Sequence, residues 1–141
     1  MKTTKIPVYG NISRPTNPEE GLEELKAGAI SWSEGDINIE YSSGEFTSVC
    51  PSTGQPDFND VVISYKPDKL YIESKCLKFY LWSFREYGIH CEKLACKIAR
   101  DISGAIECKE ITVLVKQRPR GGIGLSAIKK IIKEYESINS I

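Results

Sequence analysis

Cys50 and Asp57 are the residues whose types and spacing point most directly to chemistry. Asp57 follows Cys50 by seven positions, and Pro51, Gly54 and Pro56 lie between them. Two prolines and a glycine disfavour a continuous helix or a central strand, so we expect a turn that brings thiol and carboxylate into one pocket. A nucleophile beside a proton donor is an arrangement for covalent catalysis. The alternative is a buried structural cysteine and an aspartate that caps a turn.

The composition is that of a globular chain without a dominant charge. Its 141 residues are enough for one hydrophobic core, so we expect a single domain over residues 1–141. The 19 basic and 19 acidic residues cancel, which disfavours nucleic acid or a membrane as partner and favours a small molecule. No apolar run has the ~18 residues of a membrane span, and no signal-type segment follows the first residues. A cytoplasmic location is therefore expected.

The cysteine pattern favours reduced thiols. An odd number of cysteines without an export signal does not indicate a disulfide framework. Cys91 and Cys96 lie five positions apart, and His90 is the only histidine, so the spacing matches no zinc site and we expect no metal. The five cysteines are Cys50, Cys76, Cys91, Cys96 and Cys108.

The first half of the chain shows one helix and two strand pairs. Asn17 can cap a helix that Gly28 ends, after a loose N-terminal arm over residues 1–16. Alternating apolar residues predict a first pair, 37–41 and 45–49, joined by a turn at Ser42-Ser43-Gly44. The second pair is a hairpin of residues 61–66 and 70–75 around Pro67-Asp68.

Within the second hairpin Glu73 has a distinct position. If Ile72 faces the core, Glu73 projects to the opposite face, where a carboxylate can meet a ligand. The next segment, residues 76–86, is apolar nearly all round and predicts a helix that Gly88 ends. Such a helix has to bury two faces, for which its own sheet and another subunit are the candidates.

The second half predicts a helix over residues 91–104, a central strand over 111–115 and a C-terminal helix over 125–138. The whole order indicates an α+β domain on an antiparallel sheet. The C-terminal helix depends on the helical spacing of Ile128, Ile131, Ile132 and Tyr135.

Three segments together resemble one enzyme family. Residues 45–58 are similar to the active-site segment of the NADPH-dependent 7-cyano-7-deazaguanine reductases, the nitrile reductases of the queuosine pathway. Residues 73–80 resemble that family's signature, in which Glu-Ser-Lys precedes a helix and a second lysine lies three positions further on. Residues 119–123, Pro-Arg-Gly-Gly-Ile, resemble its C-terminal segment. The resemblance covers about residues 45 to 123, and the length is that of the short, single-domain type.

The resemblance implies a tunnelling fold. In this fold an antiparallel sheet carries two helices on one face, and the barrel is completed only by oligomerisation. Rings of subunits stack, and the ligand pockets lie at subunit interfaces. A homo-oligomer is therefore expected, which agrees with the unusually apolar segment 76–86.

The resemblance also implies a reaction. Cys50 as thiolate would attack the nitrile carbon to form a covalent thioimide, and Asp57 would deliver a proton to the nitrogen. Two NADPH molecules would then supply two hydrides in turn. Cysteine suits this chemistry because it is strongly nucleophilic as a thiolate and also leaves readily.

Carboxylates make up the implied substrate site. A guanine-like edge offers adjacent N–H donors, which one carboxylate can accept in parallel. The implied residues are Ile72, Glu73, Ser74 and Glu92. The family has a histidine directly before the second glutamate, whereas this chain has Cys91 there and His90 one place earlier. One residue turns a helix by about 100°, which would direct His90 away from the pocket. Either the loop after Gly88 shifts to restore His90, or Cys91 fills the place as a weaker donor; we favour Cys91, because moving Glu92 out of register would cost more.

Cations make up the implied NADPH site. Lys75, Lys78 and Arg120 are the candidates for its phosphates, although taken alone they would be ordinary solvated charges. No Gly-x-Gly-x-x-Gly motif is present, so binding would not be Rossmann-like.

Two other functions stay open at this point. A related archaeosine-forming amidinotransferase acts on the same nitrile in tRNA, but the Glu-Ser-Lys signature and the neutral charge disfavour it. A non-catalytic purine- or pterin-binding module of the same fold is the second, and the intact Cys50 and Asp57 disfavour that one.

Overall fold

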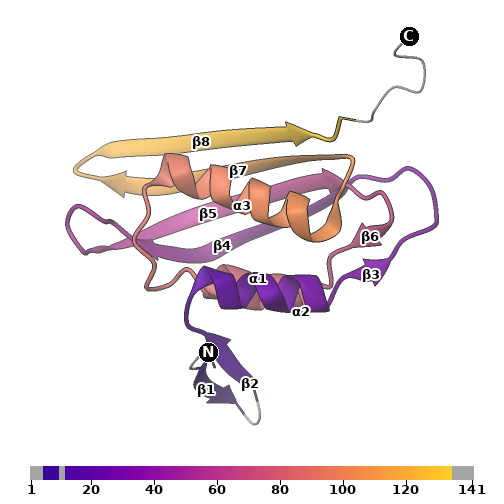
Figure 1. Cartoon of the computed structure of the whole chain (residues 1–141). Coiled ribbons are helices and arrows are strands. Elements are labelled where there is room, and N and C mark those ends of the chain that lie inside the picture. The colour runs from indigo at the N-terminus through magenta and orange to yellow at the C-terminus, as the bar shows by residue number, and fades with distance from the viewer. Residues whose placement is uncertain (1–4, 10–11, 135–141) are drawn as a thin grey trace.

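A four-stranded antiparallel sheet is the centre of the molecule (Figure 1). The structure is a computed structural model that describes residues 5–9 and 12–134, with side chains from Arg14 onward. The strands follow the order β4-β5-β7-β8, in which each neighbour is antiparallel. Their bounds are Ile39–Val49 for β4, Pro56–Lys66 for β5, Glu110–Arg120 for β7 and Ile123–Ile132 for β8.

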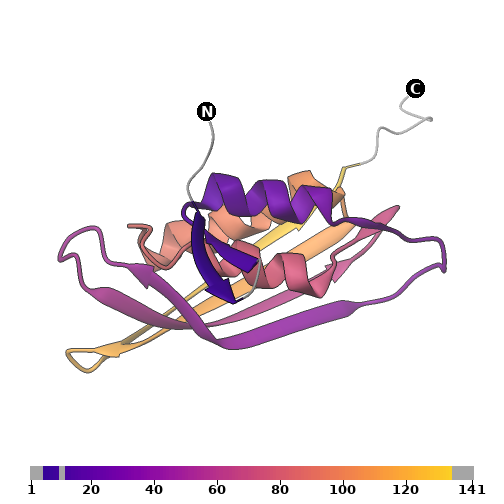
Figure 2. The same ribbon diagram turned by 90° about the horizontal axis from the view of Figure 1, so that it is seen from below.

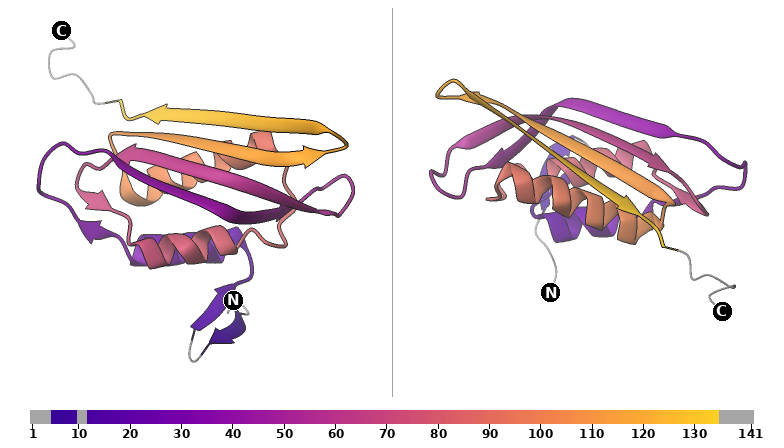
Figure 3. Two further views of the ribbon diagram at one scale, coloured as in Figure 1. Left: turned by 180° about the vertical axis from the view of Figure 1, so that it is seen from behind. Right: turned by 90° about the horizontal axis from the view of Figure 1, so that it is seen from above.

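Helices cover one face of this sheet. Helices α2 (Ser74–Trp82) and α3 (Cys91–Ile106) lie against the strands, and α1 (Pro18–Ala27) packs on both of them (Figure 2). No part of the described chain covers the opposite face, which is turned to the viewer in the left panel of Figure 3. The expected α+β class on an antiparallel sheet is thus confirmed, with two helices on the sheet and a third outside them.

The core lies between the sheet and the helices because two periodicities coincide there. Alternate residues of β5 and β7 point toward the helices, as the period of a half-buried strand requires. Residues three and four apart on α3 meet them. Every one of these side chains is at most 2% exposed: Val61, Ile63, Tyr65, Ile111, Val113, Val115, Leu94, Ile98 and Ile102.

Two glycines let α1 approach α2 closely. A methyl group on Gly21 would meet the side chain of Ser83, and one on Gly28 would meet that of Cys76. Gly21 and Gly28 are seven residues apart, and so are Cys76 and Ser83, so the two contacts lie two helical turns apart. The small side chains at all four positions therefore set the distance between α1 and α2.

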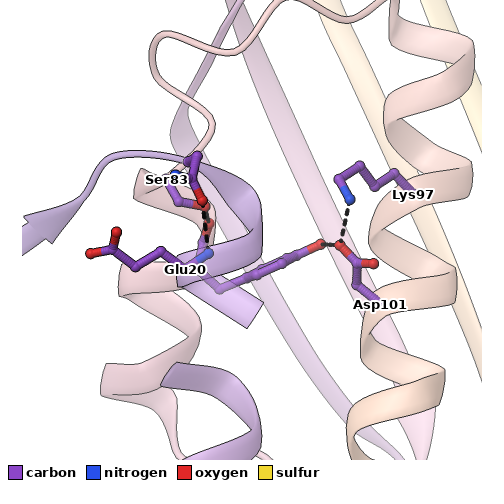
Figure 4. Close-up of polar contacts among 6 residues, drawn as sticks. Glu20, Ser83, Lys97 and Asp101 are labelled. Atoms are coloured by element: carbon purple, nitrogen blue, oxygen red, sulfur yellow. Dashed lines mark hydrogen bonds and ion pairs between the residues drawn. The ribbon is translucent and has the colours of Figure 1, made fainter. Parts of the chain in front are cut away.

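A buried polar cluster links α2 to α3 (Figure 4). Tyr80 Oη donates to Asp101 Oδ2 at 2.7 Å, and Lys97 Nζ lies 3.2 Å from the same oxygen. Burial raises the pKa of the fully buried Tyr80 well above its usual value, so it remains a donor. Nearby, Ser83 Oγ donates to the carbonyl oxygen of Tyr80, and Glu20 of α1 is also buried. These contacts tie the helical layer together.

Several elements lie where the sequence predicted them. Asn17 caps α1 by accepting from the N–H of Glu20, and Gly28 follows its last turn. Helix α3 covers the predicted segment 91–104, and the predicted central strand lies within β7, which has a neighbour on each side.

The predicted C-terminal helix over 125–138 is wrong for its described part. Residues up to Ile132 form β8, which pairs along its length with β7 after a two-residue turn. The isoleucines recur at helical spacing, but Ile is β-branched and suits a strand at least as well. Pairing with the long strand β7 decides the outcome. Residues 135–138 lie outside the described part.

The N-terminal arm was also predicted wrongly. Within residues 1–16, β1 (Lys5–Tyr9) and β2 (Ile12–Pro15) form an antiparallel hairpin. Residues 1–4 and 10–11 of this arm lie outside the described part. Both short strands contain proline, so the sequence lacks the alternation of apolar and polar residues by which a strand is predicted.

The predicted strand pairs differ in their connections. No turn occurs at Ser42-Ser43-Gly44: β4 runs through it with a bulge between Ser43 and Phe46. The predicted hairpin partner of β5 is also wrong, because β6 contains only Leu70–Tyr71 and pairs with β3 (Ile30–Ser31). Helix α2 begins at Ser74 and ends at Trp82, four residues before the predicted end.

Candidate active site

The loop between β4 and β5 brings Cys50 and Asp57 together as expected. Cys50 directly follows β4, and Asp57 is the second residue of β5. The loop closes on itself, since Cys50 N–H donates to Gln55 O at 2.9 Å and Gly54 N–H to Cys50 O at 2.8 Å. Gly54 has φ +74°, a conformation that glycine adopts without strain. Cys50 and Asp57 both line one pocket and are only 5% and 3% exposed.

Arg120 joins these two residues from the neighbouring strand β7. Its Nη1 lies 2.8 Å from Asp57 Oδ1, and its side chain also hydrogen-bonds the Cys50 thiol. The resemblance implied a phosphate contact for this residue. That contact stays a prediction; within the chain, the guanidinium lies against the carboxylate of Asp57 and the sulfur of Cys50.

Hydrogen bonds favour the thiolate form of Cys50. Bonds from the Thr53 side chain, the Arg120 side chain and the backbone around Ser52 lower the pKa of Cys50 to about 6. An ordinary cysteine has a pKa near 8.5, so most of this sulfur is anionic at neutral pH. Such a thiolate is the reactive form of a cysteine nucleophile.

His90 reaches the pocket, which differs from the expectation. The residues before it pair with the end of β4, because Val49 N–H donates to Tyr87 O and Ile89 N–H to Val49 O, both at 3.0 Å. This pairing brings His90 Nε2 to 3.3 Å from Ser52 Oγ, on the loop that follows Cys50. His90 is exposed and lines the pocket.

Cys91 and Glu92 begin α3 at the same pocket but point differently. The Cys91 thiol is buried and donates to Val115 O at 3.6 Å, so its hydrogen goes to the sheet rather than to a ligand. Burial raises the pKa of Cys91, which keeps it a neutral thiol. Glu92 is exposed in the first turn of α3 and lines the pocket.

The pocket has a volume of about 590 Å³ and includes residues that the sequence had not indicated. Thr53 could have been found, because it lies inside the Cys50 loop and a hydroxyl there can donate to the sulfur. Gln117 and Leu125 carried no signal, since only the pairing of β7 with β8 brings them here. The further residues are Ser52, Thr53, Lys93, Gln117 and Leu125.

Glu73 is in a second region, at the start of α2. Its backbone is extended and its carboxylate caps the helix, with Oε1 accepting from Lys75 N–H and Oε2 from Cys76 N–H, both at 3.1 Å. The Lys75 N–H bond is the main reason why the pKa of Glu73 is lowered. Ile72, directly before it, is 1% exposed, and Ser74 is exposed. Glu73 is thus a helix cap rather than a strand residue.

Lys75 and Lys78 lie beside a groove between α2 and β4. Both are exposed, and the groove has a volume of about 710 Å³. Its wall includes Phe79 and Trp82, whose rings stack with centroids 6.4 Å apart. The groove therefore combines cations with aromatic surface.

The two regions lie at opposite ends of β4. Tyr41 Oη, on one end, donates to Ile72 O at 3.1 Å, whereas Cys50 follows the other end. Eight residues of strand from Tyr41 to Val49 span about 25 Å. The structure therefore brings together Cys50, Asp57, His90, Glu92 and Arg120, and keeps Ile72, Glu73, Ser74, Lys75 and Lys78 apart from them.

The described residues form neither a metal-binding cluster nor a membrane-spanning helix. In the described part of the chain, no group of three or more His, Cys, Asp or Glu side chains is placed to hold a metal ion. None of the described helices is long and apolar enough to cross a membrane.

Comparison with known proteins gives one consistent family. The sequence profile of the QueF-like protein family matches residues 56–136. A protein of Thermomicrobium roseum named NADPH-dependent 7-cyano-7-deazaguanine reductase is 40% identical over 109 residues, which are 77% of this chain and 83% of that protein. A protein of the same name from Alkaliphilus metalliredigens is 48% identical over 120 residues, 85% of this chain and 72% of its own length.

A solved structure gives the same fold. The crystal structure of the archaeosine synthase QueF-Like in the apo form aligns with a TM-score of 0.61 over 70% of this chain and 95% of that chain. Its sequence identity is 21%, so this likeness concerns the fold alone. The expected tunnelling-type architecture is thus confirmed for the single chain.

Proposed function

The chain belongs to the QueF-like protein family and within it to the NADPH-dependent 7-cyano-7-deazaguanine reductases, and from this premise we propose its reaction. It is an oxidoreductase with NADPH as co-substrate. It reduces the nitrile of 7-cyano-7-deazaguanine to 7-aminomethyl-7-deazaguanine, in queuosine biosynthesis, through a covalent thioimide on Cys50. The observation that carries the proposal is the Cys50 thiol of lowered pKa beside the buried Asp57 in one pocket.

Cys50 and Asp57 carry out the first step. The sulfur of Cys50 attacks the nitrile carbon, so that one S–C bond forms and one C–N π bond breaks. The nitrogen takes up one proton from the carboxylic acid form of Asp57. This transfer leaves Asp57 as a carboxylate, which pairs with Arg120 Nη1 at 2.8 Å. The product is a neutral thioimide, which accepts hydride more readily than a nitrile because its carbon is more electrophilic.

Two further steps complete the reduction. NADPH, when bound, supplies a hydride to the substrate carbon, once at the thioimide and once at the imine. Between the two, the C–S bond breaks and Cys50 takes the electron pair back as thiolate. The lowered pKa of Cys50 supports this role, since a stable thiolate is a good leaving group. In all, the nitrile gains two hydrides and two protons.

Substrate recognition uses Glu92 and His90 in the Cys50 pocket and Glu73 from another subunit. Support comes from the distance of about 25 Å between the two ends of β4, because a bicyclic purine cannot contact both Glu73 and Cys50 of one chain. A homo-oligomer with stacked rings would bring the α2 terminus of one subunit to the Cys50 pocket of the next. Ile72 and Ser74 flank Glu73 in this site, and nucleic acid is not a partner.

Lys75 and Lys78 fit the phosphates of NADPH. Both are exposed cations three residues apart on one helix, and the adjoining groove offers the stacked Phe79 and Trp82 for a planar ring. Metal chemistry has no part in the proposal. His90, rather than the core-facing Cys91, takes the place that the family's histidine has at the substrate.

A single assay tests the proposed reaction. Purified protein is given 7-cyano-7-deazaguanine with NADPH, and NADPH oxidation and the mass of the protein are both followed. We expect about two NADPH oxidised per nitrile, and an adduct on Cys50 when NADPH is omitted. An adduct without any NADPH consumption would contradict reduction and favour an amidine-forming transferase. The absence of both would leave a purine-binding module.

A further inference from the structure

Arg120 has two partners in the pocket, Asp57 and Cys50. Its Nη1 lies 2.8 Å from Asp57 Oδ1, and its guanidinium hydrogen-bonds the Cys50 sulfur. A guanidinium carries five N–H donors in one plane and can serve two acceptors at once. Asp57 is only 3% exposed, so solvent screens this ion pair less than a surface pair.

The backbone fixes Arg120 in this place. It is the last residue of β7 and pairs with Ile123 across a two-residue turn. Gly121 and Gly122 form the turn with φ of +58° and +79°, the conformation of tight hairpins. Because β7 is the neighbour of β5, its end lies beside Asp57. The turn therefore delivers the guanidinium to the Cys50 loop.

We propose that Arg120 is a catalytic residue whose guanidinium bridges Cys50 and Asp57, holding the sulfur as a thiolate beside the carboxyl group. This inference depends on the proposed function only for the identity of the group that the thiolate attacks, the nitrile carbon. When the sulfur becomes part of a neutral thioimide, the guanidinium loses one charged partner and regains it when the C–S bond breaks. It thus favours departure of the thiolate as well as its attack.

Other charged groups also face Cys50, so their contribution has to be separated. Arg120 is the one cation among the groups that lower the pKa of Cys50; the other groups are the Thr53 side chain and the backbone at Ser52 and Thr53. The titratable and charged groups that line the pocket with Cys50 are Asp57 from β5, Arg120 from β7, and His90, Cys91, Glu92 and Lys93 at the start of α3.

Alkylation of Cys50 by iodoacetamide tests the proposal without nitrile or NADPH. The rate is measured against pH, with the modified site identified by peptide mass spectrometry. We expect a midpoint near pH 6 for the unaltered protein. In R120Q the midpoint rises by at least about one pH unit, toward the value of a free thiol. At pH 6.5 its alkylation is about threefold slower or more, whereas above pH 9 it is at least as fast, because a more basic thiolate is the better nucleophile.

R118Q is the matched control. Arg118 lies two residues earlier on the same strand and pairs with another aspartate of β5, Asp60, at 3.1 Å. Its partners are Asp60 and the carbonyl of Gly44 rather than Cys50, so R118Q should keep the unaltered midpoint. An unchanged midpoint in a folded R120Q, together with a raised KM for NADPH, would overturn the proposal and make Arg120 a phosphate ligand only.

R120K decides the question if R120Q does not fold, because it retains the charge that pairs with the buried Asp57. One ammonium group cannot take the place of a planar guanidinium between two acceptors. We expect its midpoint to lie above that of the unaltered protein and below that of R120Q. A folded R120K with an unchanged midpoint would refute the bridge. Since the assay contains no nitrile, failure of the reduction assay and failure of this inference give different results.

Discussion

The Cys50 pocket and the start of α2 contain the same kinds of side chain but use them in opposite ways. In the pocket, carboxylate, guanidinium and thiol satisfy one another, and the pairing with residues 87–89 holds the walls together. At the start of α2, the carboxylate of Glu73 caps its own helix, and Lys75 and Lys78 are exposed to solvent. The reactive groups of the first region thus contact one another within one chain, whereas those of the second region contact their own helix or solvent.

The two regions differ in how closely their groups have to be placed. Groups that make and break bonds have to be placed closely, which a closed loop and paired strands achieve inside one chain. Groups that recognise a ligand can come from a second chain, provided that assembly brings them near. In the oligomer that we propose, a neighbouring subunit would close the span of about 25 Å along β4.

The largest effect is expected at the nucleophile. Cys50→Ala should lower turnover by about a thousandfold or more, because no thioimide can form. Cys50→Ser should be nearly as inactive, since an alkoxide is a poor leaving group. NADPH oxidation and the protein mass after incubation with the nitrile are the measurements. Turnover by Cys50→Ala would refute the assigned nucleophile.

Mixing inactive variants tests whether two chains share one site. Cys50→Ala and Glu73→Ser are each expected to lack activity, and serine preserves the helix cap that Glu73 provides. If each site takes Cys50 from one chain and Glu73 from the next, random reassembly of an equal mixture should restore about a quarter of the normal activity. The two proteins are unfolded, mixed, refolded and assayed. A mixture that stays inactive would mean that one chain supplies both residues.

The cofactor region should respond more weakly. Lys78→Ala is expected to raise the KM for NADPH about tenfold, which is the loss of one charge-assisted contact to a phosphate. It should leave the pH midpoint of Cys50 alkylation unchanged. Lys26→Ala, an exposed lysine in the last turn of α1, is the control and should change neither quantity. Equal KM values for both variants would argue against the groove as the NADPH site.

The smallest effect concerns the packing that supports α2. Gly28→Ala would press a methyl group onto Cys76, so we expect a loss of about 1–3 kcal/mol in the free energy of unfolding. Gly104→Ala, in α3 where a methyl group meets nothing within 4 Å, should instead stabilise by up to about 1 kcal/mol. Urea unfolding measures both. Equal shifts would show that α1 does not constrain α2.

The sequence predicted the parts that depend on local chemistry. The cap of α1, the helix of α3 and the turn that joins Cys50 to Asp57 all follow from residue types within a few positions. Strand β8 was missed because its isoleucines fit both periodicities, and only pairing with β7 decides between them. The turn predicted at Gly44 was wrong for the same reason: β5 supplies a partner on both sides of the bulge, so β4 continues through Gly44.

The candidate site divides in the same manner. Spacing and resemblance indicated Cys50, Asp57 and Glu92, all of which line the pocket. The orientation of His90 depends on backbone bonds between residues 87–89 and β4, far apart in sequence, so a rotation argument from Glu92 alone gave the wrong answer. The place of Arg120 depends on sheet order in the same way.

The pairing of Tyr87 and Ile89 with Val49 makes hydrogen exchange a measure of how often the pocket opens. The amide hydrogens of Val49 and Ile89 both lie in bonds that cross from the β4 end to the segment before His90. They are exchanged for deuterium only when these two walls separate. Their exchange rates therefore measure how often the empty pocket opens, and any ligand that binds both walls slows the two amides together.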